Sequence, residues 1–335
     1  MHPGTMPSMK TVRFHLDPMP PFRLDLTVWA LRRRASNIID RWDGSTWRRT
    51  LRIRNAVVQV AATQVRPPDA PRLKVEVSAP ESLRIPRAEI SACVTRMLGL
   101  ERDLTPFYRM AHARRVERDS RELSALVERM RGFKPPVFPT VFEGVVNAIA
   151  CQQLSLAVGI SLLGRLTEAY GRTLRPRSWA IPNGALQGPD GGTTPRAFPE
   201  AEDLADARIP ALREMGFSTA KAEAIVGVAR AIASGGLDLE NLRGLDDETA
   251  AERLLALRGI GRWSAAYILL RSLGRLAVFP QEDSGAREKL QRLLRMRTPP
   301  EWDRIAKLLR PWHPFAGLLY YHLLLGNLAE KGHIA

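Results

Sequence analysis

Cysteine is almost absent from this chain. Cys93 and Cys151 are the two cysteines among 335 residues, and they form no Cys-x-x-Cys pair. Two distant thiols cannot build a disulfide framework, and such scarcity is typical of proteins from a reducing compartment. They also exclude a four-cysteine iron–sulfur cluster or zinc site built from this chain alone, so we expect no such cofactor.

Long apolar runs are missing as well. No stretch approaches the ~20 apolar residues that a membrane-spanning helix needs. The first twenty residues carry prolines and charges instead of a continuous apolar segment, so we expect no signal peptide. These features predict a cytoplasmic protein without a membrane partner.

Acidic residues are too few to balance the basic ones. The chain has 35 Asp and Glu against 50 Lys and Arg, a formal net charge of +15. Arginine predominates, and its planar guanidinium binds phosphate in a bidentate manner. A GC-rich genome would also favour arginine codons. The charge therefore suits a nucleic-acid partner without establishing one.

The hydrophobic patterning predicts an α+β protein with two parts. Residues 1–21 read as a flexible tail, and residues 22–112 as a small antiparallel-sheet α+β domain. Alternating apolar and polar positions predict its strands at 22–31, 46–63 and 73–79. Residues 88–100 and 107–115 show helical spacing.

Residues 113–335 read as an all-helical, two-lobed core, because strand signals nearly vanish there. Ser218 and Asp246 or Asp247 stand where helix caps are expected. A proline- and glycine-rich segment, 175–199, interrupts the helical pattern as a loop insertion.

Residues 254–270 fit a helix–hairpin–helix. Gly259 and Gly261 bracket Ile260 in the turn, between Arg258 and Arg262. Glycine lets the backbone amides approach a phosphate, and the second helix adds its positive N-terminal end. The carbonyls of residues 257–262 can also hold a monovalent cation. An ordinary helical hairpin with a glycine cap is the alternative.

Asp283 follows the hairpin after a helix-breaking Pro280, with Ser284 and Gly285 opening a further helix. An ionised carboxylate at such a position can stabilise a positively charged sugar. It can equally serve only as a helix cap. Glu282 is the competing carboxylate, and sequence order alone does not choose between them.

Aromatic residues supply candidates for a base pocket. Trp263 and Tyr267 are four residues apart on one helix face, where they either stack on an extruded base or belong to the core. Trp312, Phe315 and Trp29 are further candidates, for which a core position is favoured.

Gln152 and Gln153 stand in an apolar segment that is predicted to be one helix. Buried amides need hydrogen-bond partners, so these two side chains are expected either to find them or to face a groove. Exposure on the helix surface is the alternative, which the apolar residues around them disfavour.

Five segments together resemble the helix–hairpin–helix DNA glycosylase superfamily, and within it the AlkA-type DNA-3-methyladenine glycosylase II family. They span roughly residues 135–328. The matching segments are FEGVVNAIACQQLS, LREMGFSTAKAEAI, LRGIGRWSAAYILLRSLG, VFPQEDSG and PWHPFAGLLYYHLL. The N-terminal domain fits the same arrangement more weakly.

The resemblance implies a monomeric enzyme that binds damaged double-stranded DNA in the nucleoid and hydrolyses the glycosidic bond of an alkylated purine. Asp283 matches the catalytic aspartate, and Tyr267 and Phe315 match aromatic pocket positions. Trp263 stands where glycosylase/lyase relatives carry a Schiff-base lysine, so water is the expected nucleophile. Gln153 falls near the side chain that fills the gap left by the flipped nucleotide.

The chain departs from the family pattern in two places. Ala316 stands where members often have arginine, and Gln153 stands where AlkA itself carries leucine. The first departure removes a phosphate or structural contact, and the second changes how the duplex is held open. A glycosylase for another lesion, such as hypoxanthine or uracil, and a non-catalytic DNA-binding protein are the alternative functions.

Overall fold

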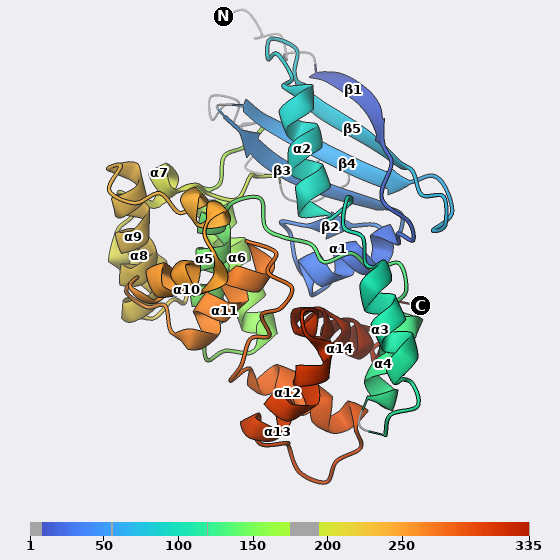
Figure 1. The fold of residues 1–335 in the computed structure, drawn as a ribbon. Helices are drawn as coiled ribbons and strands as arrows, with labels where there is room; N and C mark the ends of the chain where they lie inside the picture. Colours follow the sequence, from blue (N-terminus) through green and yellow to red (C-terminus); the bar gives the residue numbers. More distant parts are fainter. Residues whose placement is uncertain (1–8, 55, 119, 175–193, 335) are drawn as a thin grey trace, which may run out of the picture.

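The computed structural model describes residues 9–54, 56–118, 120–174 and 194–334 (Figure 1). A five-stranded antiparallel sheet comes first and is followed by helices, which confirms the predicted α+β class. The strand order is β1-β5-β4-β3-β2. The strands are β1 (Met9–Leu16), β2 (Arg41–Trp42), β3 (Thr46–Ile53), β4 (Ala56–Gln64) and β5 (Leu73–Pro80).

Alternation of side chains explains the sheet. In β4 and β5 every second residue is buried, so one face packs on the core and the other is partly solvated. Val60 lies opposite Val77 in the register of these two strands. Helix α2 (Arg87–Met97) crosses one face of the sheet (Figure 1), and its residues Ile90 and Val94 belong to the same apolar cluster as the strands.

Two predictions for the N-terminal segment are wrong. The expected tail is shorter, because residues 9–16 form the edge strand β1 with Phe14 buried. The expected strand at 22–31 is helix α1 (Leu24–Arg32), nearly all of whose side chains are buried. A helix that is enclosed on every side carries no amphipathic pattern, so periodicity misassigned it. The helices expected at 88–100 and 107–115 are confirmed as α2 and as α3 (Thr105–Arg114).

Helices fill the described part of the chain after the sheet and form two lobes below it (Figure 1). One lobe contains α5 (Val141–Cys151), α6 (Leu156–Tyr170), α7 (Ala201–Leu204), α8 (Ile209–Glu214), α9 (Thr219–Ala233), the 3-10 turn η2 (Glu240–Gly244), α10 (Asp247–Leu255) and α11 (Arg262–Arg271). The other contains α3 (Thr105–Arg114), α4 (Arg121–Arg129), α12 (Ser284–Leu293), α13 (Trp302–Leu309), the 3-10 turn η3 (Arg310–Trp312) and α14 (Ala316–Glu330).

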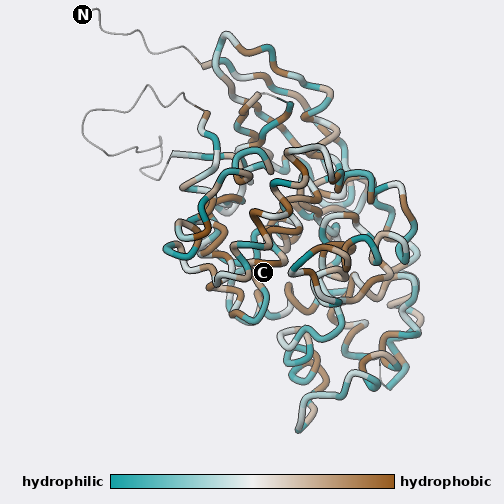
Figure 2. Tube along the Cα trace, turned by 90° about the vertical axis from the view of Figure 1, so that its left-hand side faces the viewer, coloured by the Kyte–Doolittle hydropathy of each residue, from teal (hydrophilic) through white to brown (hydrophobic). Residues whose placement is uncertain are grey.

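The apolar residues gather where the helices meet (Figure 2). One apolar cluster joins the sheet to the lobe of α5 and α11, and a second unites α1 with the lobe of α3, α4 and α14. Helix α1 contributes to both clusters, through Leu24 to the first and Leu26 to the second. The small domain is therefore built into the helical core.

Helix starts follow the predicted capping chemistry. Ser218 accepts a hydrogen bond from the backbone of Lys221, and Asp246 accepts one from Thr249. Most of the expected insertion, residues 175–193, lies outside the described residues. No helix in the described ranges is both long and apolar enough to cross a membrane.

Candidate active site

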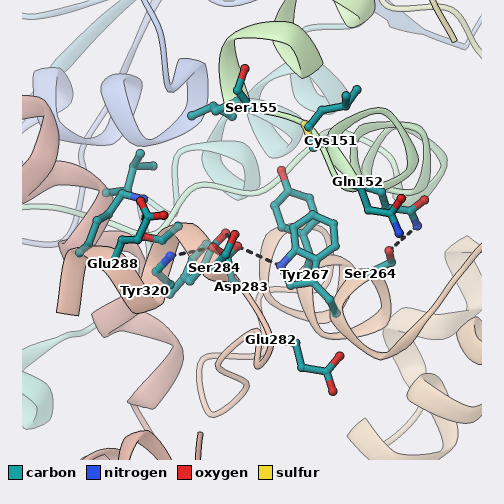
Figure 3. Close-up of a pocket in the computed structure, with 18 of the residues that line it drawn as sticks. Cys151, Gln152, Ser155, Ser264, Tyr267, Glu282, Asp283, Ser284, Glu288 and Tyr320 are labelled. Carbon is teal, nitrogen blue, oxygen red and sulfur yellow. Dashed lines mark hydrogen bonds between the residues drawn. The ribbon is translucent and has the colours of Figure 1, made fainter. Parts of the chain in front are cut away.

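A cavity of about 1020 Å³ opens between the two helical lobes. Its walls come from the turn between α5 and α6, the start of α11, the start of α12 and one face of α14 (Figure 3). Side chains that are far apart in sequence meet there, among them Arg33, Trp263, Asp283 and Tyr320. The hairpin and the following carboxylate therefore share one site.

Asp283 is both a helix cap and a cavity residue. One carboxylate oxygen accepts the backbone N–H of Ala286 at 2.7 Å, at the start of α12. The other accepts the indole N–H of Trp263 at 2.9 Å and the hydroxyl of Tyr320 at 2.8 Å. Glu282 is exposed and points away from these two partners (Figure 3). The geometry thus favours Asp283 over Glu282 as the reactive carboxylate.

Tyr320, from α14, was not predicted from the sequence. Burial, and then the charge of Asp283, raise the pKa of its phenol well above the ordinary value. The hydroxyl therefore stays protonated and remains a donor to the carboxylate. Its neighbour Tyr321 points elsewhere and donates to the carbonyl of Pro136. In the apolar segment LLYYHLLL nothing distinguishes the two tyrosines before folding.

Trp263 and Tyr267 lie in the cavity wall as a stacked pair. Their ring centroids are 5.2 Å apart with an interplanar angle of 28°. Tyr267 is buried, whereas Trp263 is half-buried and keeps surface toward the cavity. The helical spacing therefore predicted correctly that they share one face.

The turn before α11 has the backbone that its glycines suggest. Gly259 has a φ of +84°, and Gly261 is the N-cap of α11. Gly261 and Arg262 line the cavity, so the positive end of α11 faces it. Arg258 is exposed and pairs with Glu223 at 2.6 Å. Within the turn the Ile260 amide donates to the Leu257 carbonyl, so a phosphate would meet the neighbouring glycine amides and the N-terminal end of α11.

The prediction that Gln152 and Gln153 lie inside one helix is wrong. Helix α5 ends at Cys151, and Gln152 and Gln153 form the turn before α6, with Gln153 at a φ of +53°. The Gln152 amide donates to the carbonyl of Gly259 and to the hydroxyl of Ser264, each at 2.7 Å (Figure 3). Gln152 therefore braces the hairpin, while Gln153 is exposed at the rim of the cavity.

Three of the aromatic candidates lie away from the cavity. Trp312 is fully buried beside Phe107, and Phe315 packs against the same ring at 5.6 Å. Trp29 is stacked on His333 at 4.9 Å. Trp29 and Trp312 belong to the second apolar cluster and the partly buried Phe315 packs against it, because burial of a large ring in the core is strongly favourable.

Two buried arginines line the cavity, and the sequence did not indicate either of them. Arg33 caps α1 in the left-handed region, with a φ of 63°, and reaches from the N-terminal domain into the cavity. Its guanidinium donates to the Tyr267 hydroxyl at 2.7 Å and to Asn147 at 2.6 Å. Arg271, from the end of α11, donates to the carbonyl of Ala30. In the sequence, Arg33 is the middle residue of an Arg-Arg-Arg run that looks like solvated surface.

The described residues hold no group of three or more His, Cys, Asp or Glu side chains arranged for a metal ion. In the hairpin, the Gly259 carbonyl accepts from Gln152 and the Leu257 carbonyl accepts from the amide of Ile260. Each carbonyl keeps a second lone pair. The monovalent cation at residues 257–262 stays a prediction.

A sheet domain fused to two helical lobes, with a glycine hairpin and a capped aspartate at the cavity between them, defines the helix–hairpin–helix class of DNA repair proteins. The model of the HhH-GPD superfamily of base excision DNA repair proteins matches residues 146–314. The chain belongs to this superfamily.

Individual relatives share much of the chain. A DNA-3-methyladenine glycosylase of Bacillus subtilis is 30% identical over 237 residues, 71% of this chain and 72% of the relative. DNA-3-methyladenine glycosylase 2 of Escherichia coli is 30% identical over 55% of this chain and 58% of its own length. The structure of a 3-methyladenine DNA-glycosylase from Archaeoglobus fulgidus has a TM-score of 0.76 at 24% identity, covering 94% of this chain and 98% of that one. This last similarity shows the fold.

Proposed function

We propose that the protein is a monofunctional DNA glycosylase that removes alkylated purines of the 3-methyladenine class from double-stranded DNA. The observation that carries the proposal is Asp283, held by three donors in a cavity beside the hairpin. The names of the relatives from Bacillus subtilis and Escherichia coli support the substrate class. We further propose that it acts as a monomer on DNA of the nucleoid, in the cytoplasm.

In this proposal the DNA backbone binds along the hairpin and the start of α12. The hairpin amides and the ends of α11 and α12 present donors and positive partial charge to phosphates, and the net charge of +15 attracts the duplex. Gln153, exposed at the rim, enters the gap left by the flipped nucleotide. The proposed DNA-binding residues are Arg258, Gly259, Ile260, Gly261, Arg262, Gln152, Gln153, Ser284 and Gly285.

The flipped base stacks on Trp263, and Asp283 faces the deoxyribose. When the glycosidic bond breaks, its electron pair leaves with the base and positive charge develops on the sugar. The carboxylate stabilises that charge, since it is already oriented by Trp263 and Tyr320. Water then adds to C1′ and loses a proton, leaving an abasic site.

The test compares Asp283→Asn with Glu282→Gln on a duplex that contains an alkylated purine. Asp283→Asn is expected to lower single-turnover base release by roughly 100-fold or more while leaving the Kd for DNA within about twofold, because the lost charge acts mainly in the transition state. Glu282→Gln, next in sequence but turned away, should behave as wild type. Undiminished release by Asp283→Asn would overturn the assignment.

A further inference from the structure

The floor of the cavity carries two positive charges without a carboxylate partner. Neither Arg33 nor Arg271 forms an ion pair within the described residues, although they are 5% and 1% exposed. The buried carboxylate of Glu143 pairs with Arg49 instead. Among the residues that the structure describes, Nε of Arg33, and Nε and one Nη of Arg271, have no hydrogen-bond partner. Because buried charges are normally paired, we expect these two guanidiniums to interact with a further group when the cavity is occupied.

Both guanidiniums act on Tyr267. Arg33 donates to its hydroxyl oxygen at 2.7 Å, and the guanidinium carbon of Arg271 lies 5.7 Å from its ring centroid. Because Trp263 stacks on the same ring, Tyr267 offers little free ring surface to a base. It offers its hydroxyl instead. The Tyr267 oxygen already accepts a hydrogen bond from Arg33. Because burial raises the pKa of the phenol, the hydroxyl stays protonated and can donate a hydrogen bond to a base.

This arrangement distinguishes bases by charge and by hydrogen-bonding edge. A flipped purine with a formal positive charge meets two like charges at the buried floor, against the single carboxylate of Asp283 in the cavity wall. A neutral purine with a carbonyl finds a donor at Tyr267, and the negative charge it gains as the glycosidic bond breaks is stabilised by the guanidiniums. Cation–π attraction at Trp263 acts in the opposite direction and favours the cationic base.

We propose that Arg33, supported by Arg271 and acting through the Tyr267 hydroxyl, is a specificity-determining residue that favours neutral, carbonyl-bearing purines over cationic ones. The inference rests on the proposed function, because it assigns part of the base pocket. Arg33 is a positioning residue in this scheme, since it touches Tyr267 and sets the charge of the floor. The left-handed backbone of Arg33 fits such a role, because a strained conformation is retained where it delivers a side chain.

The experiment measures single-turnover base release from three otherwise identical duplexes. One contains hypoxanthine, which is neutral with a carbonyl; one contains 3-methyladenine, which is cationic without a carbonyl; and one contains 7-methylguanine, which is cationic with a carbonyl. The variants are Arg33→Gln, which removes the charge, Arg33→Lys, which keeps it, and Tyr267→Phe, which keeps the ring. Tyr321→Phe is the matched control, because that hydroxyl donates to the carbonyl of Pro136.

Arg33→Gln is expected to lower the hypoxanthine to 3-methyladenine rate ratio by about tenfold, and Arg33→Lys to restore most of it. Tyr267→Phe should slow release of both carbonyl-bearing bases relative to 3-methyladenine. Each ratio is measured on one enzyme preparation, so a loss of folded protein cancels.

Two kinds of failure are distinguishable. Unchanged ratios in Arg33→Gln, or a wild type that releases both cationic bases and no hypoxanthine, would overturn the role of Arg33 and leave the proposed function standing. A wild type that releases neither 3-methyladenine nor 7-methylguanine would contradict the proposed function itself, whether or not it releases hypoxanthine.

Discussion

The carboxylate of Asp283 is oriented before DNA arrives. Its three donors come from the backbone of α12 and from Trp263 and Tyr320, so one residue serves as helix cap and as the proposed reactive group. The sequence showed Asp283 and Trp263 because each stands in a short local pattern. It could not show Tyr320, which α14 brings to the cavity from 37 residues away in the chain.

The identity of residue 263 also bears on strand cleavage. With tryptophan there, wild-type enzyme is expected to give no borohydride-trapped imine with substrate DNA. Lys289 is the alternative amine that could form an imine, because it lines the cavity and burial lowers its pKa. Its Nζ donates to the Gly285 carbonyl at 2.8 Å. Trp263→Lys provides the positive comparison. Trapping by the wild type that disappears in Lys289→Ala would refute hydrolysis without lyase activity and identify the amine.

At the scale of elements, the two glycines of the hairpin turn are needed for different reasons. A Cβ on Gly259 would lie 2.7 Å from the Cβ of Ala224 on α9, and its φ is +84°. A Cβ on Gly261 would meet no atom of the described chain within 4 Å. Gly259 is therefore required by the fold, whereas the space beside Gly261 is free for a phosphate to approach.

Alanine substitutions should reveal this difference. Gly259→Ala is expected to cost about 1–3 kcal/mol of unfolding free energy, because the residue is strained and meets α9. Gly261→Ala should leave stability within about 0.5 kcal/mol but weaken DNA binding several-fold, since the added methyl obstructs a phosphate. Denaturant melts and DNA titrations at fixed salt measure both. Unaltered DNA affinity in Gly261→Ala would argue against phosphate contact at the turn.

At the scale of the whole molecule, a buried ion network joins the sheet domain to the helical core. Arg49 of β3 is 1% exposed and binds Asp40 at 2.9 Å and Glu143 of α5 at 2.5 Å. The indole of Trp47 also donates to Asp40. Because α1 delivers Arg33 to the cavity, the position of the sheet domain also positions part of the cavity wall.

Arg49→Met should therefore destabilise the protein by about 3–5 kcal/mol, because it leaves two buried carboxylates uncompensated. Arg13→Ala breaks the exposed pair with Glu76 and should change stability by less than about 1 kcal/mol. Chemical denaturation of both variants gives the comparison. Equal, small effects would show that the network contributes little to joining the domains.

The sequence by itself determined the strand pattern of 46–63 and 73–79, the helical core, the glycine hairpin and the carboxylate pair Glu282 and Asp283, because each depends on a pattern within about twenty residues. Only the fold favoured Asp283 over Glu282. Tertiary structure alone decided that α1 is a helix and that Gln152 braces the hairpin. It also decided which side chains line the cavity: Arg33 and Tyr320 do, whereas Trp29, Trp312 and Phe315 lie elsewhere. The physical reason is that burial and hydrogen-bond partners are set by segments distant in the chain. Local periodicity carries no information about those contacts.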